Sequence, residues 1–165
     1  MTAATARVLT VEDDPIVRAD LRLVLEEAGF DVCADARDGI EAVELARAHT
    51  PDLILLDLGL PRLGGVEAAR EILRDRQVPI VALTGRSSAL ANKALEAGAV
   101  GLLRKPFVVA DLVRTVRDAL TVSRERQASR SVVAEIVGPL GYPESWAVEL
   151  EEAAFRAGHA WKRSG

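Results

Sequence analysis

The chain has 165 residues, a net charge of −4 and one cysteine, Cys33. This length allows one domain with a full hydrophobic core and a small extension, but it is too short for two full domains. The charge gives no general reason to expect nucleic-acid binding, and a single cysteine excludes an internal disulfide. No apolar run approaches the roughly 18 residues of a membrane span. The first residues also lack the layout of a secretory signal, so we expect a cytoplasmic protein.

Apolar segments of two kinds alternate along residues 7–120. Short runs rich in branched side chains are typical of strands, and longer segments with apolar residues three or four positions apart are typical of helices. The predicted strands are residues 7–11, 32–36, 53–57, 79–84 and 100–104, and the predicted helices are residues 15–28, 39–50, 66–73, 91–97 and 109–120. Five strand–helix units in strict alternation predict a parallel sheet with helices on both faces. Cys33 lies in one of the strands, which favours a packed thiol over a nucleophile.

Polar side chains stand at the carboxyl ends of four predicted strands. They are Glu12 and Asp13 after the first strand, Asp57 at the end of the third, Thr84 at the end of the fourth and Lys105 after the fifth. In a doubly wound sheet these strand ends share one rim, where ligands bind. Taken by itself, Asp57 is more typical of a residue that caps the next helix. Together, the five side chains predict one convergent site.

The converging side chains suit phosphoryl transfer with a metal ion. Three carboxylates, those of Glu12, Asp13 and Asp57, repel one another unless a cation lies among them. Oxygen ligands without histidine or cysteine favour a hard ion such as Mg²⁺. Mg²⁺ and Lys105 balance the three negative charges, and with the Thr84 hydroxyl they can orient and neutralise a phosphoryl group. Asp57 can then accept that group as an aspartyl phosphate.

Five motifs together resemble the receiver domain of the response regulators of two-component signalling systems. In chain order they are Glu12-Asp13, Leu55-Leu56-Asp57, Leu60-Pro61 with Gly64-Gly65, Leu83-Thr84-Gly85 and Lys105-Pro106-Phe107. The resemblance covers about residues 7–120 and implies a flavodoxin-like, doubly wound five-stranded parallel sheet with strand order 2-1-3-4-5. It also implies that Asp57 accepts a phosphoryl group from a histidine kinase or phosphotransfer protein. On this interpretation the chain is a signalling protein and not an enzyme, apart from its own phosphorylation and dephosphorylation.

The resemblance also assigns a role to each site residue. It implies that Asp13, Asp57 and the backbone carbonyl of Gly59 bind Mg²⁺, and that Glu12 holds the ion largely through water.

For the phosphoryl group, the resemblance implies that Thr84 and Lys105 bind the phosphoryl oxygens. The Lys105-Pro106 bond is expected to be cis, an isomer that proline makes accessible. Phosphorylation is expected to switch the surface near the fourth and fifth helices.

Two residues depart from the family pattern. Leu102 stands where the family usually carries Tyr or Phe, three residues before the lysine, whose ring swings inward when the threonine moves. Leu102 either moves with the fourth helix or rests inward at all times. Gly85 replaces a more usual alanine, which makes the loop after Thr84 costlier to order.

Two other functions fit part of this pattern. A phosphohydrolase with an aspartate nucleophile commonly has a second acid two residues after it, but here that position is Gly59, so the general acid is missing. A pseudo-receiver that binds partners without phosphorylation has no need of the complete set of acids, hydroxyl and lysine.

The resemblance does not extend to the end of the chain. We therefore assign residues 1–122 to the receiver domain and residues 123–165 to a linker and a helical C-terminal extension. No Gly or Pro falls between Pro106 and Gly138, so the fifth helix can run on into the extension. A last helix is expected from Pro143, with an apolar stripe from Trp146 to Trp161.

The extension and the surface of the fourth and fifth helices are the expected partner surfaces. The positive and negative charges of the extension balance, and its length does not suit a helix-turn-helix domain, so we expect neither DNA nor membrane binding. An apolar stripe on a helix usually marks an interaction surface. We expect these surfaces to contact the receiver, a second copy of the chain or a downstream protein.

Overall fold

The computed structural model describes residues 4–137, 148–149 and 152–153. Strands and helices alternate strictly through residue 137. They are β1 (Arg7–Val11), α1 (Pro15–Glu27), β2 (Asp31–Ala36), α2 (Gly39–His49), β3 (Leu53–Asp57), α3 (Gly65–Asp75), β4 (Ile80–Thr84), α4 (Ser88–Ala97), β5 (Gly101–Arg104) and α5 (Val109–Val137).

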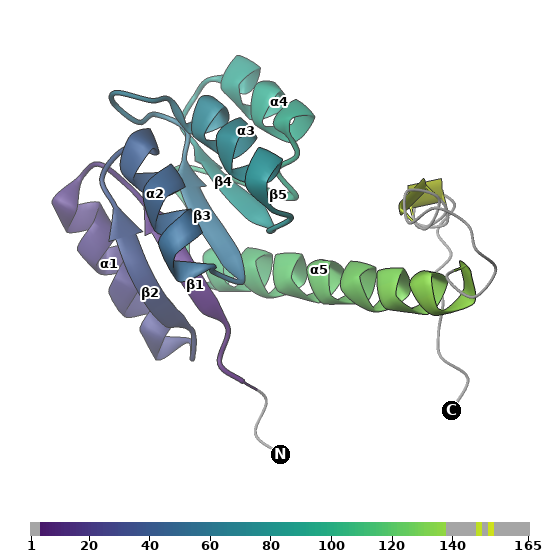
Figure 1. Ribbon diagram of the computed structural model, residues 1–165. Coiled ribbons are helices and arrows are strands. Elements are labelled where there is room, and N and C mark those ends of the chain that lie inside the picture. The colour runs from purple at the N-terminus through teal and green to yellow at the C-terminus, as the bar shows by residue number, and fades with distance from the viewer. Residues whose placement is uncertain (1–3, 138–147, 150–151, 154–165) are drawn as a thin grey trace. The chain divides into compact units, whose positions relative to one another are not determined.

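The five strands form one parallel sheet in the order β2-β1-β3-β4-β5, as Figure 1 shows. The predicted flavodoxin-like fold and its strand order are therefore confirmed. The winding direction reverses between β1 and β3, which are neighbours although α1, β2 and α2 separate them in the sequence. In such a sheet, ligands bind outside the carboxyl ends of the strands at this reversal.

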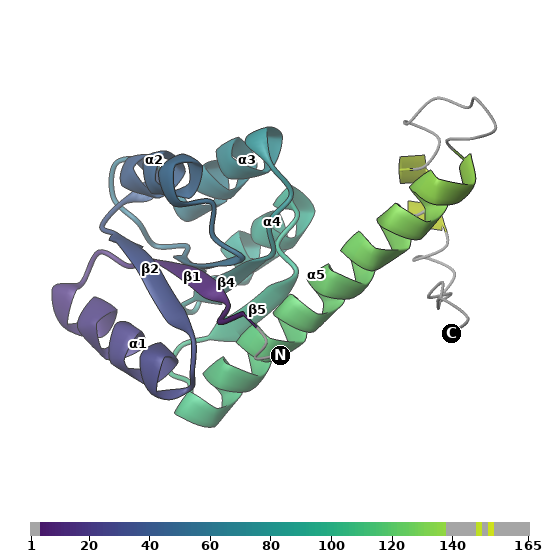
Figure 2. The ribbon, with the colours of Figure 1, turned by 60° about the horizontal axis from the view of Figure 1, so that its bottom comes forward.

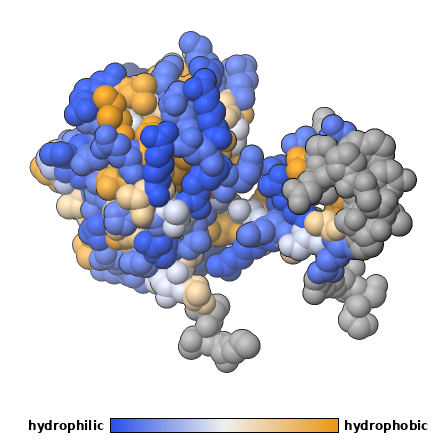
Figure 3. Space-filling view, in the orientation of Figure 1, coloured by the Kyte–Doolittle hydropathy of each residue, from blue (hydrophilic) through white to orange (hydrophobic). Residues whose placement is uncertain are grey.

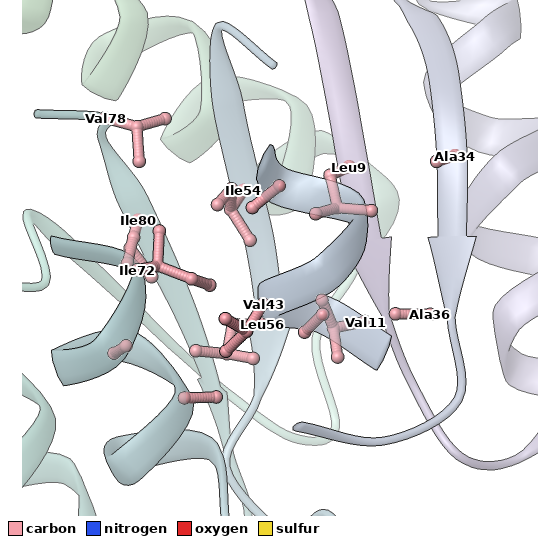
Figure 4. Close-up of a cluster of buried hydrophobic side chains, with 14 residues drawn as sticks. Leu9, Val11, Ala34, Ala36, Val43, Ile54, Leu56, Ile72, Val78 and Ile80 are labelled. Carbon is pink, nitrogen blue, oxygen red and sulfur yellow. The ribbon is translucent and has the colours of Figure 1, made fainter. Parts of the chain in front are cut away.

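Helices cover both faces of the sheet, with α1 and the first part of α5 on one face and α2, α3 and α4 on the other (Figure 2). The first four residues of β3, Leu53 to Leu56, are all apolar because both faces of this strand are covered. Leu53 and Leu55 pack toward α1 and α5, whereas Ile54 and Leu56 pack toward α2 and α3 (Figure 4). Successive side chains of a strand point to opposite faces, so a strand covered on both faces needs apolar residues throughout.

Several elements begin or end one to three residues away from the predicted positions. Helix α4 begins at Ser88 rather than at Ala91, because the Ser87 hydroxyl accepts a hydrogen bond from the backbone N–H of Leu90 and caps the helix. Helix α1 is likewise capped by Asp14 and has Pro15 in its first turn. The first three residues of α4 are exposed, so the apolar periodicity that marks the buried face of this helix begins only at Ala91.

Helix α5 is continuous over Val109–Val137, so the prediction that it runs past Leu120 is confirmed. Contacts divide the chain into two units, residues 1–120 and 121–165, and α5 begins in the first and ends in the second. Residues 148–149 and 152–153 are helical. Apart from these, the predicted last helix and its stripe from Trp146 to Trp161 lie outside the described residues.

The surface of the first unit is mostly hydrophilic on the face that Figure 3 shows, and its hydrophobic residues form small separate patches. Among the described residues, no helix is both long enough and apolar enough to cross a membrane.

Candidate functional site

The loop after β1 presents two acids of the predicted site and is held in place by its backbone. The backbone N–H of Glu12 donates to the carbonyl of Ala36 on β2 (3.0 Å). The Arg18 guanidinium, on α1, donates to the carbonyl of Glu12 (2.7 Å) and more weakly to that of Asp13 (3.4 Å). The Glu12 side chain is buried and that of Asp13 is exposed. The loop therefore holds one carboxylate inside the rim and one at the solvent.

Asp57 ends β3 beside this loop and is itself buried. One carboxylate oxygen from each of Glu12, Asp13 and Asp57 lies within 4.8 Å of the others. The register explains this proximity, because β1 and β3 are neighbours and Val11 pairs with Leu56. The three acids that the sequence placed at one rim do come together in the structure.

Lys105 bridges two of the acids from the far side of the site. Its Nζ donates to Glu12 Oε2 (3.0 Å) and to Asp57 Oδ2 (3.1 Å). The remaining oxygens accept backbone hydrogen bonds, Glu12 Oε1 from Asp14 (3.2 Å) and Asp57 Oδ1 from Gly59 (3.1 Å). Charged hydrogen bonds of this kind orient both carboxylates.

The pKa values of buried Glu12 and of its half-buried partner Lys105 both lie above their ordinary values. Burial raises the pKa of the Glu12 carboxyl, the hydrogen bond from Lys105 opposes this, and the nearby charge of Asp57 raises it further, so the pKa lies above its ordinary value. Burial lowers the pKa of Lys105, but its hydrogen bonds and charge interactions with Glu12 and Asp57 outweigh that effect and raise the pKa. The lysine thus stays charged between the two carboxylates.

The donor set fits a divalent cation of the Mg²⁺ type. Lys105 compensates one of the three negative charges of Glu12, Asp13 and Asp57, which leaves two negative charges for a bound ion. All three side chains offer hard oxygen ligands, and Mg²⁺ needs only one or two protein carboxylates besides water.

Thr84 ends β4 next to this cluster, and its side chain is turned toward α4. The backbone N–H of Lys105 donates to the Thr84 carbonyl (2.8 Å), which joins the two strand ends. The Thr84 hydroxyl is buried and donates a long hydrogen bond to the carbonyl of Ser87 (3.4 Å), the residue that caps α4. The structure therefore puts Thr84 at the rim, with its hydroxyl in contact with the start of α4.

The two remaining positions from the sequence lie on or just after β5. The Lys105-Pro106 peptide bond is cis, the isomer that the resemblance implies. Leu102 is half-buried and packs inward under α4. It lies against a small core cluster formed by Leu58, Val66, Ala82, Ala94 and Ala99.

The sequence analysis did not identify three residues that hold the loops of the site in place, namely Asp14, Arg18 and Ser87. The position of Asp14 immediately before Pro15 was a usable signal, because aspartate is a preferred helix cap. No local pattern pointed to Arg18, whose contact with the loop depends on the path of the loop over α1. The sequence also did not indicate that Ser87 caps α4 and contacts Thr84, because a serine in a polar loop has many possible partners.

The chain matches the family model of the response regulator receiver domain over residues 8–117. It belongs to this family. Receiver domains are the phosphoacceptor signalling domains of two-component systems. Among curated proteins, this receiver is similar to the transcriptional regulatory protein PdtaR of Mycobacterium tuberculosis, with 42% identity over 135 residues. That match covers 81% of this chain and 66% of PdtaR, so the chain spans just under two thirds of that relative.

Solved receiver structures agree with this assignment. A two-component response regulator of the LuxR family from Aurantimonas superposes with a TM-score of 0.68 and 41% identity, covering 72% of this chain and 86% of that chain. The receiver domain of the sensor histidine kinase PA1611 from Pseudomonas aeruginosa has a TM-score of 0.65 and 35% identity, covering 72% and 99%. In that structure a magnesium ion is coordinated in the active-site cleft.

Proposed function

We propose that this receiver is the phosphoacceptor part of a response regulator and that Asp57 receives the phosphoryl group in a Mg²⁺-dependent reaction. The donor is a phosphohistidine of a histidine kinase or of a phosphotransfer protein. The observation that carries the proposal is the position of Lys105 Nζ, 3.1 Å from Asp57 within a cluster of three carboxylates. This combination supplies both an acceptor oxygen and the positive charge that a phosphoryl group requires.

Asp57 acts as the nucleophile because its carboxylate is oriented by Lys105 and by the backbone of Gly59. One of its oxygens forms a bond to phosphorus while the bond between phosphorus and the donor histidine breaks. The histidine ring keeps the electron pair of that bond, so Asp57 gives up no proton. With acetyl phosphate as donor, acetate is the leaving group.

The proposed ligands for Mg²⁺ are Asp13, Asp57 and the Gly59 carbonyl, with Glu12 acting largely through water. When bound, the ion supplies positive charge that neutralises the phosphoryl oxygens. Lys105 and Thr84 bind the same oxygens from the other side in this proposal. Turnover is limited to phosphorylation and dephosphorylation of Asp57.

The switch begins with a change of charge at Asp57. Phosphorylation replaces a charge of −1 by about −2, and this attracts Lys105 and the Thr84 hydroxyl. The hydroxyl then leaves its contact with the Ser87 carbonyl at the first turn of α4. We infer that this change shifts the surface of α4 and α5, where a second copy or a downstream protein binds.

The domain assignment is part of the same proposal. Residues 1–122 form the receiver, and residues 123–165 form the extension, which begins within α5. The extension is a second candidate contact surface for the receiver or for a partner chain.

The test is phosphate incorporation from acetyl phosphate, followed by intact-mass spectrometry of the full chain. The wild-type protein takes up one phosphoryl group when Mg²⁺ is present and none when EDTA is added. Asp57→Asn takes up none, whereas the control Asp20→Asn, which changes an exposed acid of α1, behaves as wild type. Equal incorporation by Asp57→Asn contradicts the proposal.

A further inference from the structure

The loop between β3 and α3, residues 58–64, is in contact with the start of α2. This loop contains Gly59, whose carbonyl is a proposed Mg²⁺ ligand, so a role for the loop in metal binding rests on the proposed function. Leu63 of this loop lies against Gly39, the first residue of α2. A Cβ atom on Gly39 would lie 2.0 Å from the Leu63 carbonyl oxygen and 2.8 Å from its carbon. Only glycine allows the two backbones to come this close.

An ion pair joins the same two segments beside this contact. Arg62 Nη1 forms an ion pair with Asp38 Oδ2 (3.0 Å), and Asp38 Oδ1 accepts the backbone N–H of Glu41 (2.9 Å) as the cap of α2. Each oxygen of the Asp38 carboxylate therefore has a partner within the protein, and the side chain is only 9% exposed. Arg62 is the only described residue of this loop with a left-handed backbone, at a φ of 65°. A residue other than glycine keeps such a backbone only where its surroundings hold it.

The two ends of the loop are fixed by other contacts. A Cβ atom on Gly65 would lie 2.5 Å from the Asp57 carbonyl oxygen, so the start of α3 is pressed against the end of β3. Leu60 and Leu63 pack against the core cluster under α2 and α3. The polar support of the middle of the loop thus comes from Asp38 through Arg62.

We propose that Asp38 and Arg62 form a latch that positions the β3–α3 loop for metal binding. The latch fixes the backbone around Gly59 before the ion arrives, which raises the affinity of the site for Mg²⁺. Neither residue touches the ion or the phosphoryl group. Both are positioning residues that act through the loop.

Because Asp38 and Arg62 carry opposite charges, variants of the two residues distinguish a positioning effect on Mg²⁺ affinity from a purely electrostatic one. Removing the negative charge of Asp38 weakens attraction for Mg²⁺, whereas removing the positive charge of Arg62 strengthens it. Loss of the latch weakens binding in both cases. A charge effect therefore changes the affinity in opposite directions in the two variants, and a positioning effect changes it in the same direction.

The variants Asp38→Asn and Arg62→Asn leave other features intact. Asparagine still caps a helix at position 38, and it adopts a left-handed backbone readily at position 62. The control is Arg37→Gln, because Arg37 pairs with Glu41 at the start of α2 and makes no hydrogen bond or ion pair with the described loop. Arg62→Asn carries the test alone if Asp38→Asn reduces the yield of folded protein.

The experiment measures Mg²⁺ affinity by calorimetry and amide hydrogen exchange of residues 58–64 without Mg²⁺, on the full chain. Each latch variant is expected to bind Mg²⁺ about 3- to 10-fold more weakly, at or below the range typical of residues that support metal ligands. The double variant is expected to bind no more weakly than the weaker single variant, because both remove one contact. Exchange of the loop amides is faster in all three variants and unchanged in Arg37→Gln.

Affinities that equal the wild-type value, or that move in opposite directions in the two single variants, overturn the latch. Weaker Mg²⁺ binding without faster amide exchange of residues 58–64 overturns the latch too, because the loss of affinity then does not come from a change in the loop. A wild-type chain that binds no Mg²⁺ contradicts the proposed function, and the latch with it. A wild-type chain that binds Mg²⁺ alongside variants that bind it equally well contradicts the latch alone.

Discussion

Lys105 Nζ donates a hydrogen bond to Glu12 Oε2 across 3.0 Å, and this contact joins the loop after β5 to the loop after β1. The Glu12 side chain is 3% exposed and Lys105 is its only cationic partner among the described residues. A buried carboxylate that loses its cationic partner destabilises the folded state, unless another cation takes the place of that partner.

Lys105→Met is therefore expected to lower the free energy of unfolding by about 1–3 kcal/mol in the absence of divalent ions. Mg²⁺ should recover most of this loss, because the ion replaces the missing positive charge beside Glu12 and Asp57. Urea unfolding with and without Mg²⁺ measures both effects. Equal stability of wild type and variant without the ion would show that the bridge does not stabilise the fold.

The raised pKa of Glu12 predicts how stability depends on pH. An acid whose folded-state pKa is raised binds a proton more readily in the folded chain than in the unfolded one. Its contribution to stability is present below the ordinary pKa of 4.5 and is lost as the pH rises through the higher folded-state value. Glu12→Gln removes this dependence. Relative to wild type, the variant should gain stability as the pH rises above 4.5 without divalent ions.

Urea unfolding over a pH series measures that relative stability. Glu27→Gln, at an exposed position on α1, is the control and should show no such trend. A difference between wild type and Glu12→Gln that stays constant with pH would contradict the raised pKa.

Three glycines near the site are expected to respond differently to alanine. A Cβ on Gly85 meets no atom within 4 Å, so Gly85→Ala should raise the free energy of unfolding by about 0.4–1 kcal/mol by restricting the unfolded chain. Gly39→Ala and Gly65→Ala place a Cβ 2.0 Å and 2.5 Å from backbone oxygens and should be destabilising. Thermal unfolding of the three variants checks the ranking. A Gly85→Ala variant as unstable as the other two would contradict the open space after Thr84.

Cys33 is expected to react slowly with alkylating reagents at neutral pH. Burial raises the pKa of its thiol, and its Sγ lies 3.5 Å from the Val8 carbonyl oxygen. Only the thiolate reacts, so the rate should rise as the pH passes above 9.0, the ordinary value for the thiol. Mass spectrometry of iodoacetamide labelling gives the rate at each pH. A rate at neutral pH equal to that of a small free thiol would contradict the packed position.

The sequence predicted the fold well because four strands carry a short apolar run, β2 alternates apolar and polar residues, and a helical pattern follows every strand. It also predicted that Glu12, Asp57 and Lys105 meet, because parallel strands present their carboxyl ends at one rim. The sequence could not predict which group each side chain contacts. That Thr84 turns to Ser87, or that Arg62 reaches Asp38, depends on side-chain rotamers and on the path of a loop.

Two further features, the start of a helix and the placement of one side chain, could not be predicted from sequence patterns. The start of α4 was placed three residues too late, since its exposed first residues, after the cap Ser87, do not belong to the buried apolar face. The sequence left open whether Leu102 moves with α4 or rests inward at all times; the structure shows it packed inward against the core cluster under α4.

The central claim is that Asp57 is the phosphoacceptor, and the most direct measurement locates the phosphoryl group in the chain. An aspartyl phosphate is an acyl phosphate, which borohydride reduces to homoserine at the modified position. After treatment with acetyl phosphate and Mg²⁺, peptide sequencing by mass spectrometry should find homoserine at position 57. Homoserine at the position of Asp13 or of any other acid, with Asp57 unmodified, would contradict the account.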